Sequence, residues 1–373
     1  MFPLLFVLLG QDGGAPQANG ALQQAPAPKL VTKPEMEFIR VSPDKKGFQT
    51  TGKNWRPWGF NYDHDHEGRL IEDYWDKEWD KIEGDFAEMR DMGVNSVRIH
   101  LQLGKFLDGP KTPNRKRLAK LRQLCALARE TGLRLNLTGL GCYHKNDVPA
   151  WYDLLDEKGR WEAQATFWKS IGREISDDPV VFCLDLMNEP VVPGGKRQPG
   201  DWLGPPFGGK HFVQVITLDQ ASRPRSEIAK SWIDKLVREI RTVDTNHLIT
   251  VGLVDWSLDR PGLSSGFIPE KTCQSLDFLS VHLYPKRGKR NEAHQTLKDF
   301  QVGKPLVLEE TFALECPPKE LGEFLKSEER ELAGVFSFYW GKPLPELKQS
   351  KSIGDAILRD WLEVFLPLNP NKK

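Results

Sequence analysis

The chain has 373 residues, with 52 Lys and Arg against 52 Asp and Glu, so its formal net charge is zero. This balance argues against the basic surface of a nucleic-acid-binding protein or of a protein held on an anionic membrane. The length is enough for one barrel of alternating strands and helices, which takes about 250 residues, with long loops, or for two domains.

The first 29 residues differ in composition from the rest. Residues 1–9 are an apolar run that is too short to span a bilayer and resembles the apolar region of a secretory signal, although no Lys or Arg precedes it. Residues 11–29 are rich in Gly, Ala, Pro and Gln, which is typical of a disordered linker. We therefore predict a signal-like segment and linker over 1–29, a single folded domain over 30–373, and a secreted or periplasmic protein. The alternatives are a start further upstream or a buried first strand.

From residue 55 onward, short apolar runs alternate with longer stretches of helical period. The runs predict eight strands: Pro57–Tyr62, Ser96–His100, Arg134–Thr138, Val180–Met187, Leu248–Gly252, Phe278–His282, Leu306–Glu310 and Gly334–Phe338.

Most of the stretches between these strands place apolar side chains on one helix face. Three such sets are Trp75, Trp79, Ile82, Phe86 and Met89; Leu118, Leu121, Cys125 and Ala128; and Ile228, Trp232, Leu236 and Ile240. "DMG" at 91–93 and "ETG" at 130–132 place Gly at helix ends, whereas the stretch around 269–276 is only weakly helical. Eight strand–helix units predict an α/β fold, a closed (β/α)8 barrel. An open doubly wound sheet is the alternative, but no GxGxxG follows the first strand.

Active residues of such barrels lie at the carboxyl ends of the strands. The fourth strand, within "CLDLMNEP" at 183–190, ends where Pro190 cannot continue the ladder, which leaves Glu189 at the barrel mouth. Alternation places Asp185 on the same face as Glu189. An inward-facing acid is costly unless it is paired or functional, so this strand end is a candidate site.

The seventh predicted strand, within "KPLVLEETF", ends in two consecutive glutamates, Glu309 and Glu310. Strict alternation allows only one of them to point inward. We choose Glu310, the one nearer to the mouth, and Glu309 is the alternative.

Carboxylates at the ends of strands four and seven would face each other across the mouth. Such a pair is what cleavage of a glycosidic bond needs, because one group protonates the leaving oxygen and the other attacks the anomeric carbon or activates water. Solvated surface charges are the alternative reading of each glutamate taken alone. The chain also has 12 tryptophans, whose large faces suit stacking on sugar rings.

Motifs at other strand ends extend this pattern. In chain order they are "DMGVNSVRIHL" at 91–101, "MNEP" at 187–190, "LDFLSVHLYP" at 276–285, "KPLVLEE" at 304–310 and "GVFSFYW" at 334–340. This ordered set resembles glycoside hydrolase family 5, the cellulase and mannanase family of retaining TIM-barrel hydrolases. The resemblance covers residues 47 to 366.

The resemblance implies a role for each matching residue. Glu189 would be the general acid/base and Glu310 the nucleophile. The substrate-binding set would be Asn188 on the sugar 2-hydroxyl, Arg98 and Tyr284 beside the nucleophile, His282 on the sixth strand, and Trp340 under the first sugar.

Two departures from the family pattern stand out. The family's Glu-Phe-Gly is Glu310-Thr311-Phe312 here, and the histidine often found after the third strand has no clear counterpart. His144 comes several residues late, and we read it as a loop histidine.

Several other features have both a structural and a functional interpretation. Consecutive acids and histidines over Asp63–His66 rarely converge on one metal ion, so we predict a polar loop at the mouth in which Asp65 or His66 contacts sugar. In the Gly- and Pro-rich stretch 191–225, Trp202 is either a sugar platform or part of a local cluster. Asn136 begins a glycosylation sequon inside a predicted strand, and we discount it. A Cys142–Cys183 disulfide is possible but has no support in the spacing.

We therefore predict a secreted, monomeric retaining glycoside hydrolase that cleaves a β-linked polysaccharide or oligosaccharide and needs neither metal nor cofactor. Family frequency favours β-1,4-mannan or β-glucan. The alternatives are an exo-acting β-glycosidase or transglycosylase, a non-catalytic carbohydrate-binding barrel, and a metal-dependent hydrolase using Asp63–His66.

Overall fold

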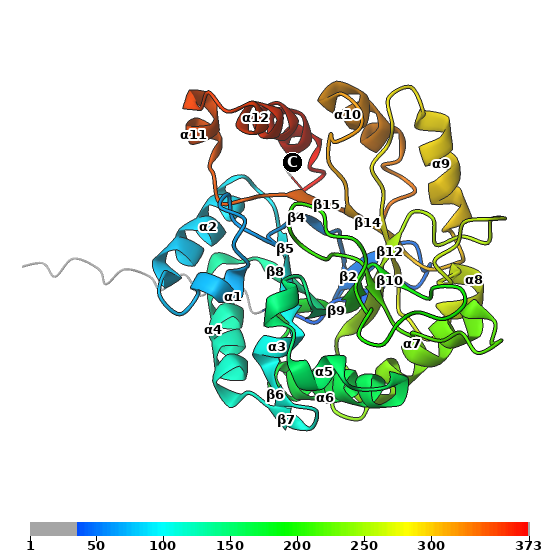
Figure 1. Ribbon diagram of the computed structural model, residues 1–373. Coiled ribbons are helices and arrows are strands. Elements are labelled where there is room, and N and C mark those ends of the chain that lie inside the picture. Colours follow the sequence, from blue (N-terminus) through cyan, green and yellow to red (C-terminus); the bar gives the residue numbers. More distant parts are fainter. Residues whose placement is uncertain (1–35, 372–373) are drawn as a thin grey trace, which may run out of the picture. The chain divides into compact units, whose positions relative to one another are not determined.

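Eight parallel strands close into a barrel in the computed structural model (Figure 1), which describes residues 36–371. The strands, in barrel order, are β4 (Trp58–Asn61), β5 (Ser96–Gln102), β8 (Arg134–Gly141), β9 (Val181–Asn188), β12 (Leu248–Val254), β13 (Leu279–His282), β14 (Leu306–Glu310) and β15 (Gly334–Phe338). Each of the eight predicted strands is present and the (β/α)8 class is confirmed. The open sheet is wrong, since β15 pairs with β4 and closes the ring. The signal-like segment and linker of 1–29 lie outside the described residues.

Helices follow the strands and surround the barrel (Figure 1). The longer ones are α2 (Trp79–Asp91), α4 (Arg115–Thr131), α6 (Glu157–Ile175), α7 (Arg225–Arg241), α9 (Arg290–Asp299), α10 (Pro318–Ser327) and α12 (Ile353–Phe365). Shorter ones are α1 (Ile71–Tyr74), α3 (Leu103–Phe106), α5 (Ala150–Asp153), α8 (Pro269–Thr272) and α11 (Leu344–Gln349), with single 3-10 turns at Lys145–Asp147 and Leu366–Leu368. The fifth crossover holds only α8, as its weak helical pattern predicted. None of the described helices has the length and apolarity needed to cross a bilayer.

One polar side chain and one predicted glycine mark the two ends of α4. The Asn114 side chain accepts a hydrogen bond from Arg117 N at the start of α4, which satisfies a backbone donor that the helix leaves free. At the other end Gly132 has φ +80°, a left-handed conformation that favours glycine. The chain can therefore leave α4 sharply and enter β8.

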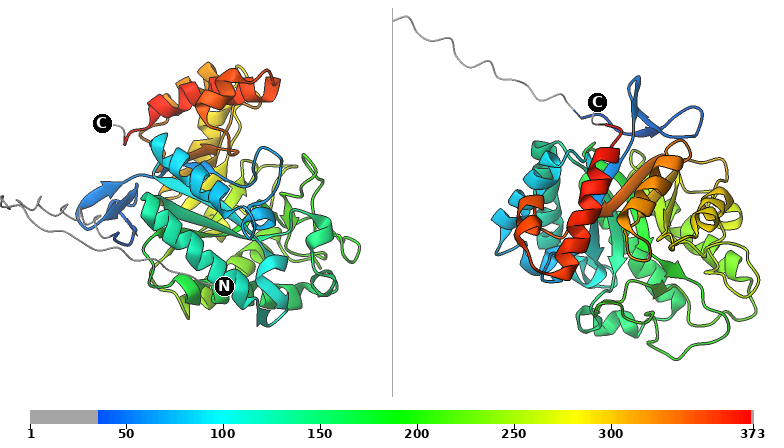
Figure 2. Two further views of the ribbon diagram at one scale, coloured as in Figure 1. Left: turned by 90° about the vertical axis from the view of Figure 1, so that its left-hand side faces the viewer. Right: turned by 90° about the horizontal axis from the view of Figure 1, so that it is seen from above.

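The amino-terminal end of the barrel is covered by a small antiparallel sheet. It is built from β1 (Arg40–Val41), β2 (Phe48–Thr50) and β3 (Lys53–Trp55), drawn in blue in Figure 2. Phe48 packs edge-on against Phe182 and Phe278, with ring centroids 5.0 and 5.1 Å apart. This aromatic cluster fills that end, so the chemistry is confined to the opposite end, where the polar strand ends lie.

Two small two-stranded sheets lie in the loops at the carboxyl end of the barrel. β6 (Leu107–Gly109) pairs with β7 (Thr112–Pro113), and β10 (Pro190–Val191) pairs with β11 (Gln214–Val215). The second pair joins the start of the long loop between β9 and α7 to its later part at Gln214–Val215. All five cysteines are buried and free, so the possible Cys142–Cys183 disulfide is not formed.

A substitution at Trp232 would test the packing of the helices against the barrel. This side chain is fully buried on α7, its indole N–H donates to Gln164 Oε1 at 2.7 Å, and its ring meets Phe267 edge-on. We expect Trp232→Ala to lower the free energy of unfolding by about 3–5 kcal/mol, because it leaves a large cavity and an unpaired amide. Urea denaturation followed by fluorescence measures this. Leu154→Ala, at a side chain that is 85% exposed, is the control and should stay within about 0.5 kcal/mol of wild type. An equal loss in both variants would contradict the packing.

Candidate active site

Arg98 on β5 is the centre of the polar cluster inside the carboxyl end of the barrel. It is fully buried. Its Nη1 donates to Asn61 Oδ1 at 2.9 Å and to Glu310 Oε1, and its Nη2 donates to Asp185 Oδ2 at 2.8 Å and Asn188 Oδ1 at 2.9 Å. One guanidinium thus fixes side chains from three other strands, β4, β9 and β14.

Burial alone would lower the pKa of Arg98, but the charges of Glu309, Asp185 and Glu310 outweigh it and raise that pKa well above its usual value. Burial and the charge of Glu309 raise the pKa of Asp185 to about 6. Asp185 is the inward-facing acid of the sequence pattern. It accepts from Arg98, from Thr138 Oγ1 at 2.7 Å and from Gly252 N at 2.7 Å, so it is a paired, structural acid.

Both glutamates at the end of β14 point into the barrel, and the expectation that only one does is wrong. Val281 of β13 pairs with Leu308 and His282 pairs with Glu310, so Glu309 is the extra residue of a β-bulge. The bulge breaks the alternation of the strand. It lets two consecutive side chains enter the same interior, where both meet Arg98.

Glu309 lies at the deeper level. It is 0% exposed, and its Oε1 accepts from Asn136 Nδ2 at 2.6 Å. Its Oε2 lies 3.4 Å from His282 Nε2 and 3.7 Å from Arg98 Nη2. Burial raises the pKa of Glu309, but Arg98 and His282 outweigh burial and bring this pKa below its ordinary value. Glu309 is therefore a fixed anion.

Glu310 lies nearer to solvent, with 8% of its surface exposed. Tyr284 donates its hydroxyl hydrogen to Glu310 Oε2 at 2.8 Å while Arg98 holds the other oxygen. Burial, followed by the charges of Glu310 and Glu189, raises the pKa of Tyr284 well above its usual value, so the phenol stays a donor. The predicted contacts of Arg98 and Tyr284 with Glu310 are both present.

Glu189 reaches the site through an irregular backbone rather than through regular alternation. Thr250 of β12 pairs with Asp185, yet Gly252 pairs with Asn188, so β9 also carries an extra residue. Glu189 then has φ +47°, an uncommon conformation for a residue other than glycine, and its N–H donates to Gly252 O at 2.9 Å. Strained backbone of this kind is concentrated at functional sites.

His282 lies between the acids. Its Nδ1 is 3.0 Å from Glu189 Oε1 and 3.5 Å from Glu310 Oε2. One oxygen of Glu189, one of Glu310 and a ring nitrogen of His282 all lie within 4.8 Å of one another. Burial lowers the pKa of His282, but Glu310, Glu189 and Glu309 outweigh it and raise this pKa to about 10. The two predicted catalytic carboxylates are therefore brought together across the His282 imidazole.

Within residues 36–371, these three side chains are the one group whose ligand atoms converge closely enough to surround a metal ion. Arg98 and Tyr284 already donate to the Glu310 oxygens, and His282 Nδ1 would have to lose a proton to bind a metal. This donor set fits proton transfer better than metal binding, and we assign none of these residues as metal ligands.

Because Gly252 on β12 has no side chain, His282, Arg98 and Glu309 can pack closely against its backbone. A Cβ at this position would lie 2.9 Å from His282 Nε2, 3.0 Å from Arg98 Nη2 and 3.1 Å from Glu309 Oε2. All three atoms belong to the interlocked network, so none can move without breaking an ion pair. Any side chain here would disturb the site.

The other predicted substrate-binding residues are placed as follows. Asn188 is buried, with its carbonyl oxygen on Arg98 and its amide donating to Phe212 O at 3.1 Å. Trp340 follows β15 and contacts His64, whose ring is nearly parallel at 5.6 Å, and Phe312 at 5.3 Å. The buried indole N–H of Trp340 has no partner in the described structure. The sugar contacts of both residues stay predictions.

Sequence reasoning missed several members of the network. Asn136, discounted as a sequon, is fully buried and holds Glu309. His100 on β5 is buried, its Nδ1 lies 2.6 Å from Tyr143 Oη, and its Nε2 has no partner in the described structure. Burial and the charge of Arg98 hold the pKa of His100 well below its usual value. A signal was available for His100, which alternation places on the same strand face as Arg98.

The Asp63–His66 stretch is a structured loop. Asp65 is fully buried and accepts from the backbone of Glu67 and Arg69 and from the Arg69 side chain, so the expectation that Asp65 contacts sugar is wrong. His66 is exposed. His144 lies in a loop, 3.9 Å from an Asp73 carboxylate oxygen, as expected.

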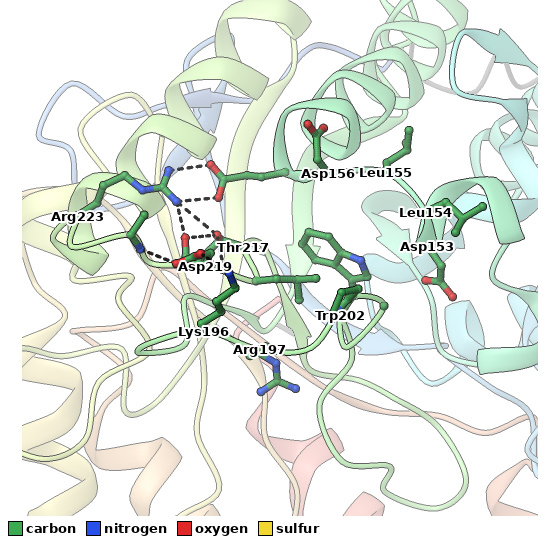
Figure 3. Close-up of a pocket in the computed structure, with 15 residues that line it drawn as sticks. Asp153, Leu154, Leu155, Asp156, Lys196, Arg197, Trp202, Thr217, Asp219 and Arg223 are labelled. Carbon is green, nitrogen blue, oxygen red and sulfur yellow. Dashed lines mark hydrogen bonds and ion pairs between the residues drawn. The ribbon is translucent and has the colours of Figure 1, made fainter.

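Figure 3 shows a pocket of about 710 Å³ between the start of α6 and the loop from β9 to α7. Trp202 lines it but is only 2% exposed, because its ring packs with Val191 and Val215 and the Arg160 guanidinium lies 4.0 Å from the ring centre. The local-cluster interpretation of Trp202 is confirmed, and an exposed sugar platform at this residue is excluded.

Comparisons with known proteins identify the family of the chain. Residues 43–312 match the family model for cellulase (glycosyl hydrolase family 5). Mannan endo-1,4-beta-mannosidase 7 of Arabidopsis thaliana is 25% identical over 134 residues, which are 33% of this chain and 25% of that protein. Mannan endo-1,4-beta-mannosidase 4 of Solanum lycopersicum is 25% identical over 119 residues, 30% of this chain and 23% of that protein. The matched segment is therefore only about a quarter of these relatives' length.

Solved structures share the fold. An exo-beta-1,4-mannosidase from Opitutaceae bacterium strain TAV5 has a TM-score of 0.62 at 17% identity, covering 88% of this chain and 61% of that one. The beta-mannanase of the blue mussel Mytilus edulis has a TM-score of 0.58 at 15% identity, covering 88% and 96%. On the family model, which spans most of the barrel, this chain belongs to glycosyl hydrolase family 5.

Proposed function

We propose that the protein is a retaining β-glycanase that uses Glu310 as nucleophile and Glu189 as general acid/base. The observation that carries this is the pair of carboxylates whose oxygens approach within 4.8 Å at the barrel mouth. Retaining enzymes hold the two carboxyl groups about 5–5.5 Å apart, whereas inverting enzymes leave about 6.5–9.5 Å for a water molecule.

In the first step Glu310 attacks the anomeric carbon and Glu189 gives its proton to the leaving oxygen, so that a covalent glycosyl-enzyme forms. Arg98 and Tyr284 hold Glu310 in one orientation, which reduces the entropic cost of attack. In the second step Glu189, now a carboxylate, takes a proton from water, and the oxygen of that water displaces Glu310 from the sugar. The anomeric configuration is retained because two inversions occur at one carbon.

As substrate we propose a β-1,4-linked mannan. The support is that the curated relatives are named as mannan endo-1,4-beta-mannosidases. Secretion, which the apolar run at residues 1–9 indicates, suits a polymer outside the cell and belongs to the same proposal. Chromatography of the products distinguishes the two modes of action, because internal cutting gives a range of oligosaccharides and end-clipping gives mainly one small sugar.

The first test is reducing-sugar release from β-mannan, β-glucan, xyloglucan and xylan. We expect activity on β-mannan, and we expect Glu189→Ala and Glu310→Ala to lose roughly two to four orders of magnitude in kcat. Glu329→Ala is the matched control, because Glu329 is exposed at the amino-terminal end of the barrel. Full activity of either site variant would refute its catalytic role, and exclusive activity on another polymer would refute the substrate.

A second test separates the two roles. A 2-deoxy-2-fluoro mannoside with a good leaving group should add one sugar mass to the protein, and peptide mapping should place it on Glu310 and not on Glu309. With a nitrophenyl mannoside, azide should give the β-mannosyl azide with Glu189→Ala, because azide attacks the glycosyl-enzyme without base assistance, and the α-mannosyl azide with Glu310→Ala, because azide there takes the place of the missing carboxylate. A label on Glu309 would refute Glu310 as nucleophile, and the opposite azide configurations would exchange the two roles.

The close approach at Gly252 gives a third prediction. Gly252→Ala should lower kcat by about tenfold or more, since its Cβ pushes His282, Arg98 and Glu309 apart and small misplacements at a catalytic centre are costly. Gly84→Ala is the control. Gly84 lies on the exposed face of α2 with open space around it, so alanine there should raise helix stability by about 0.5–1 kcal/mol and leave kcat unchanged. Unchanged kcat in both variants would show that the cluster tolerates displacement.

A further inference from the structure

Double displacement uses two carboxylates, yet a third one, Glu309, lies beneath them. Glu309 has no exposed surface, so it cannot touch substrate directly. Its partners are Asn136, Arg98 and His282. Of these, only His282 also contacts both proposed catalytic residues.

We propose that Glu309 is a positioning residue that keeps His282 doubly protonated and aims its Nδ1–H at Glu189. This inference rests on the proposed function for its catalytic consequence, but the protonation of His282 can be measured without any substrate.

Both ring nitrogens of His282 face carboxylates, which favours a proton on each of them. Nε2 faces Glu309 Oε2 at 3.4 Å, and Nδ1 faces Glu189 Oε1 at 3.0 Å and Glu310 Oε2 at 3.5 Å. A neutral imidazole has one N–H, so one of its nitrogens would direct a lone pair at a carboxylate. The doubly protonated ring can donate a hydrogen from Nε2 to Glu309 and from Nδ1 to Glu189. His282 is 2% exposed, which leaves little room for water to correct a mismatch.

The charges around His282 come from several elements. Glu309 and Glu310 on β14 and Glu189 after β9 favour the cation, while burial and Arg98 on β5 oppose it. The backbone of Gly252 on β12 lies close to the ring, and Asp255, just after β12, interacts electrostatically with Glu189. His100 on β5 interacts electrostatically with His282. On β13 itself, Tyr284 is a neutral donor to Glu310. Glu309 therefore offsets Arg98 at the Nε2 side, where no other carboxylate of residues 36–371 is in contact.

The consequence for catalysis is electrostatic. When the Glu189 proton passes to the leaving oxygen, Glu189 becomes an anion, and the fixed Nδ1–H beside it stabilises the charge as it forms. The same hydrogen bond then orients Glu189 as base toward water. His282 keeps both protons through both steps, and Glu309 acts only through His282.

The decisive experiment is ¹⁵N NMR of the histidine side chains across pH 6–10 without substrate. His282→Gln assigns the signals by their loss. In wild type we expect both His282 nitrogens to be protonated at pH 8. In Glu309→Gln we expect deprotonation at least about one pH unit lower, because removing a neighbouring anion lowers the pKa of a cation.

Kinetics with a cleaved substrate follow from the same effect. Glu309→Gln should lower kcat by about tenfold with little change in KM and move the alkaline limb of the kcat profile to lower pH, and Glu309→Asp should restore part of kcat. Glu328→Gln is the matched control. Glu328 is also buried and lies 2.9 Å from a histidine nitrogen, that of His294, but between α9 and α10 on the outside of the barrel. Its kcat and pH profile should not change.

A neutral His282 in wild type at pH 8 would overturn the proposal, and so would unchanged His282 signals in Glu309→Gln. If Glu309→Gln does not fold, the wild-type titration and Glu309→Asp still decide. The expected NMR result together with inactivity on every glycan would support the role of Glu309 toward His282 and refute the proposed function alone.

Discussion

The structure of the site depends on one buried cation. The Arg98 guanidinium is removed from solvent inside the barrel, and it is stable there because Asp185, Glu309 and Glu310 surround it. A buried charge without partners costs several kcal/mol, so neither the cation nor the acids could occupy this space alone. Asp185 comes from β9 and the two glutamates from β14, so the cluster also links strands that are distant in sequence to Arg98 on β5. Fold and site are therefore one electrostatic unit at this end of the barrel.

Regular strands could not build this unit. Alternation sends every second side chain to the helix side, and a regular β14 would bury either Glu309 or Glu310 against apolar helices. The bulge at Glu309 avoids that cost by turning both inward. A second irregularity on β9, with the left-handed Glu189 after it, does the same for Asn188 and Glu189. The backbone strain is offset by the hydrogen bonds that the reoriented side chains make with Arg98 and His282.

These two irregularities explain which features of the fold and the site could be predicted from the sequence. Eight strands and most of their helices follow from apolar spacing, because burial against the barrel imposes that spacing on the chain. Glu189 and Glu310 can be predicted because they stand at the mouth ends of their strands. Glu309 is only the alternative in the sequence, because regular alternation allows one inward glutamate and no residue type in "VLEETF" marks the bulge. The roles of Asp65 and Trp202 could not be predicted for a related reason. The residue type alone does not show whether a polar or aromatic side chain of a loop packs within the loop or faces solvent.

Two adjacent glutamates with the same chemistry are made different by depth alone. Glu309 is fully enclosed by Asn136, Arg98 and His282, so its charge is fixed and its position cannot adapt. Glu310, one residue further along, keeps some exposed surface, and Arg98 and Tyr284 are its hydrogen-bond donors. An anion that attacks a carbon must be able to lose its hydrogen bonds as the new bond forms, whereas an anion that positions a cation must keep them. In the mechanism proposed above, the bulge separates these two requirements within a single dipeptide, and His282 connects the buried Glu309 to the two proposed catalytic carboxylates.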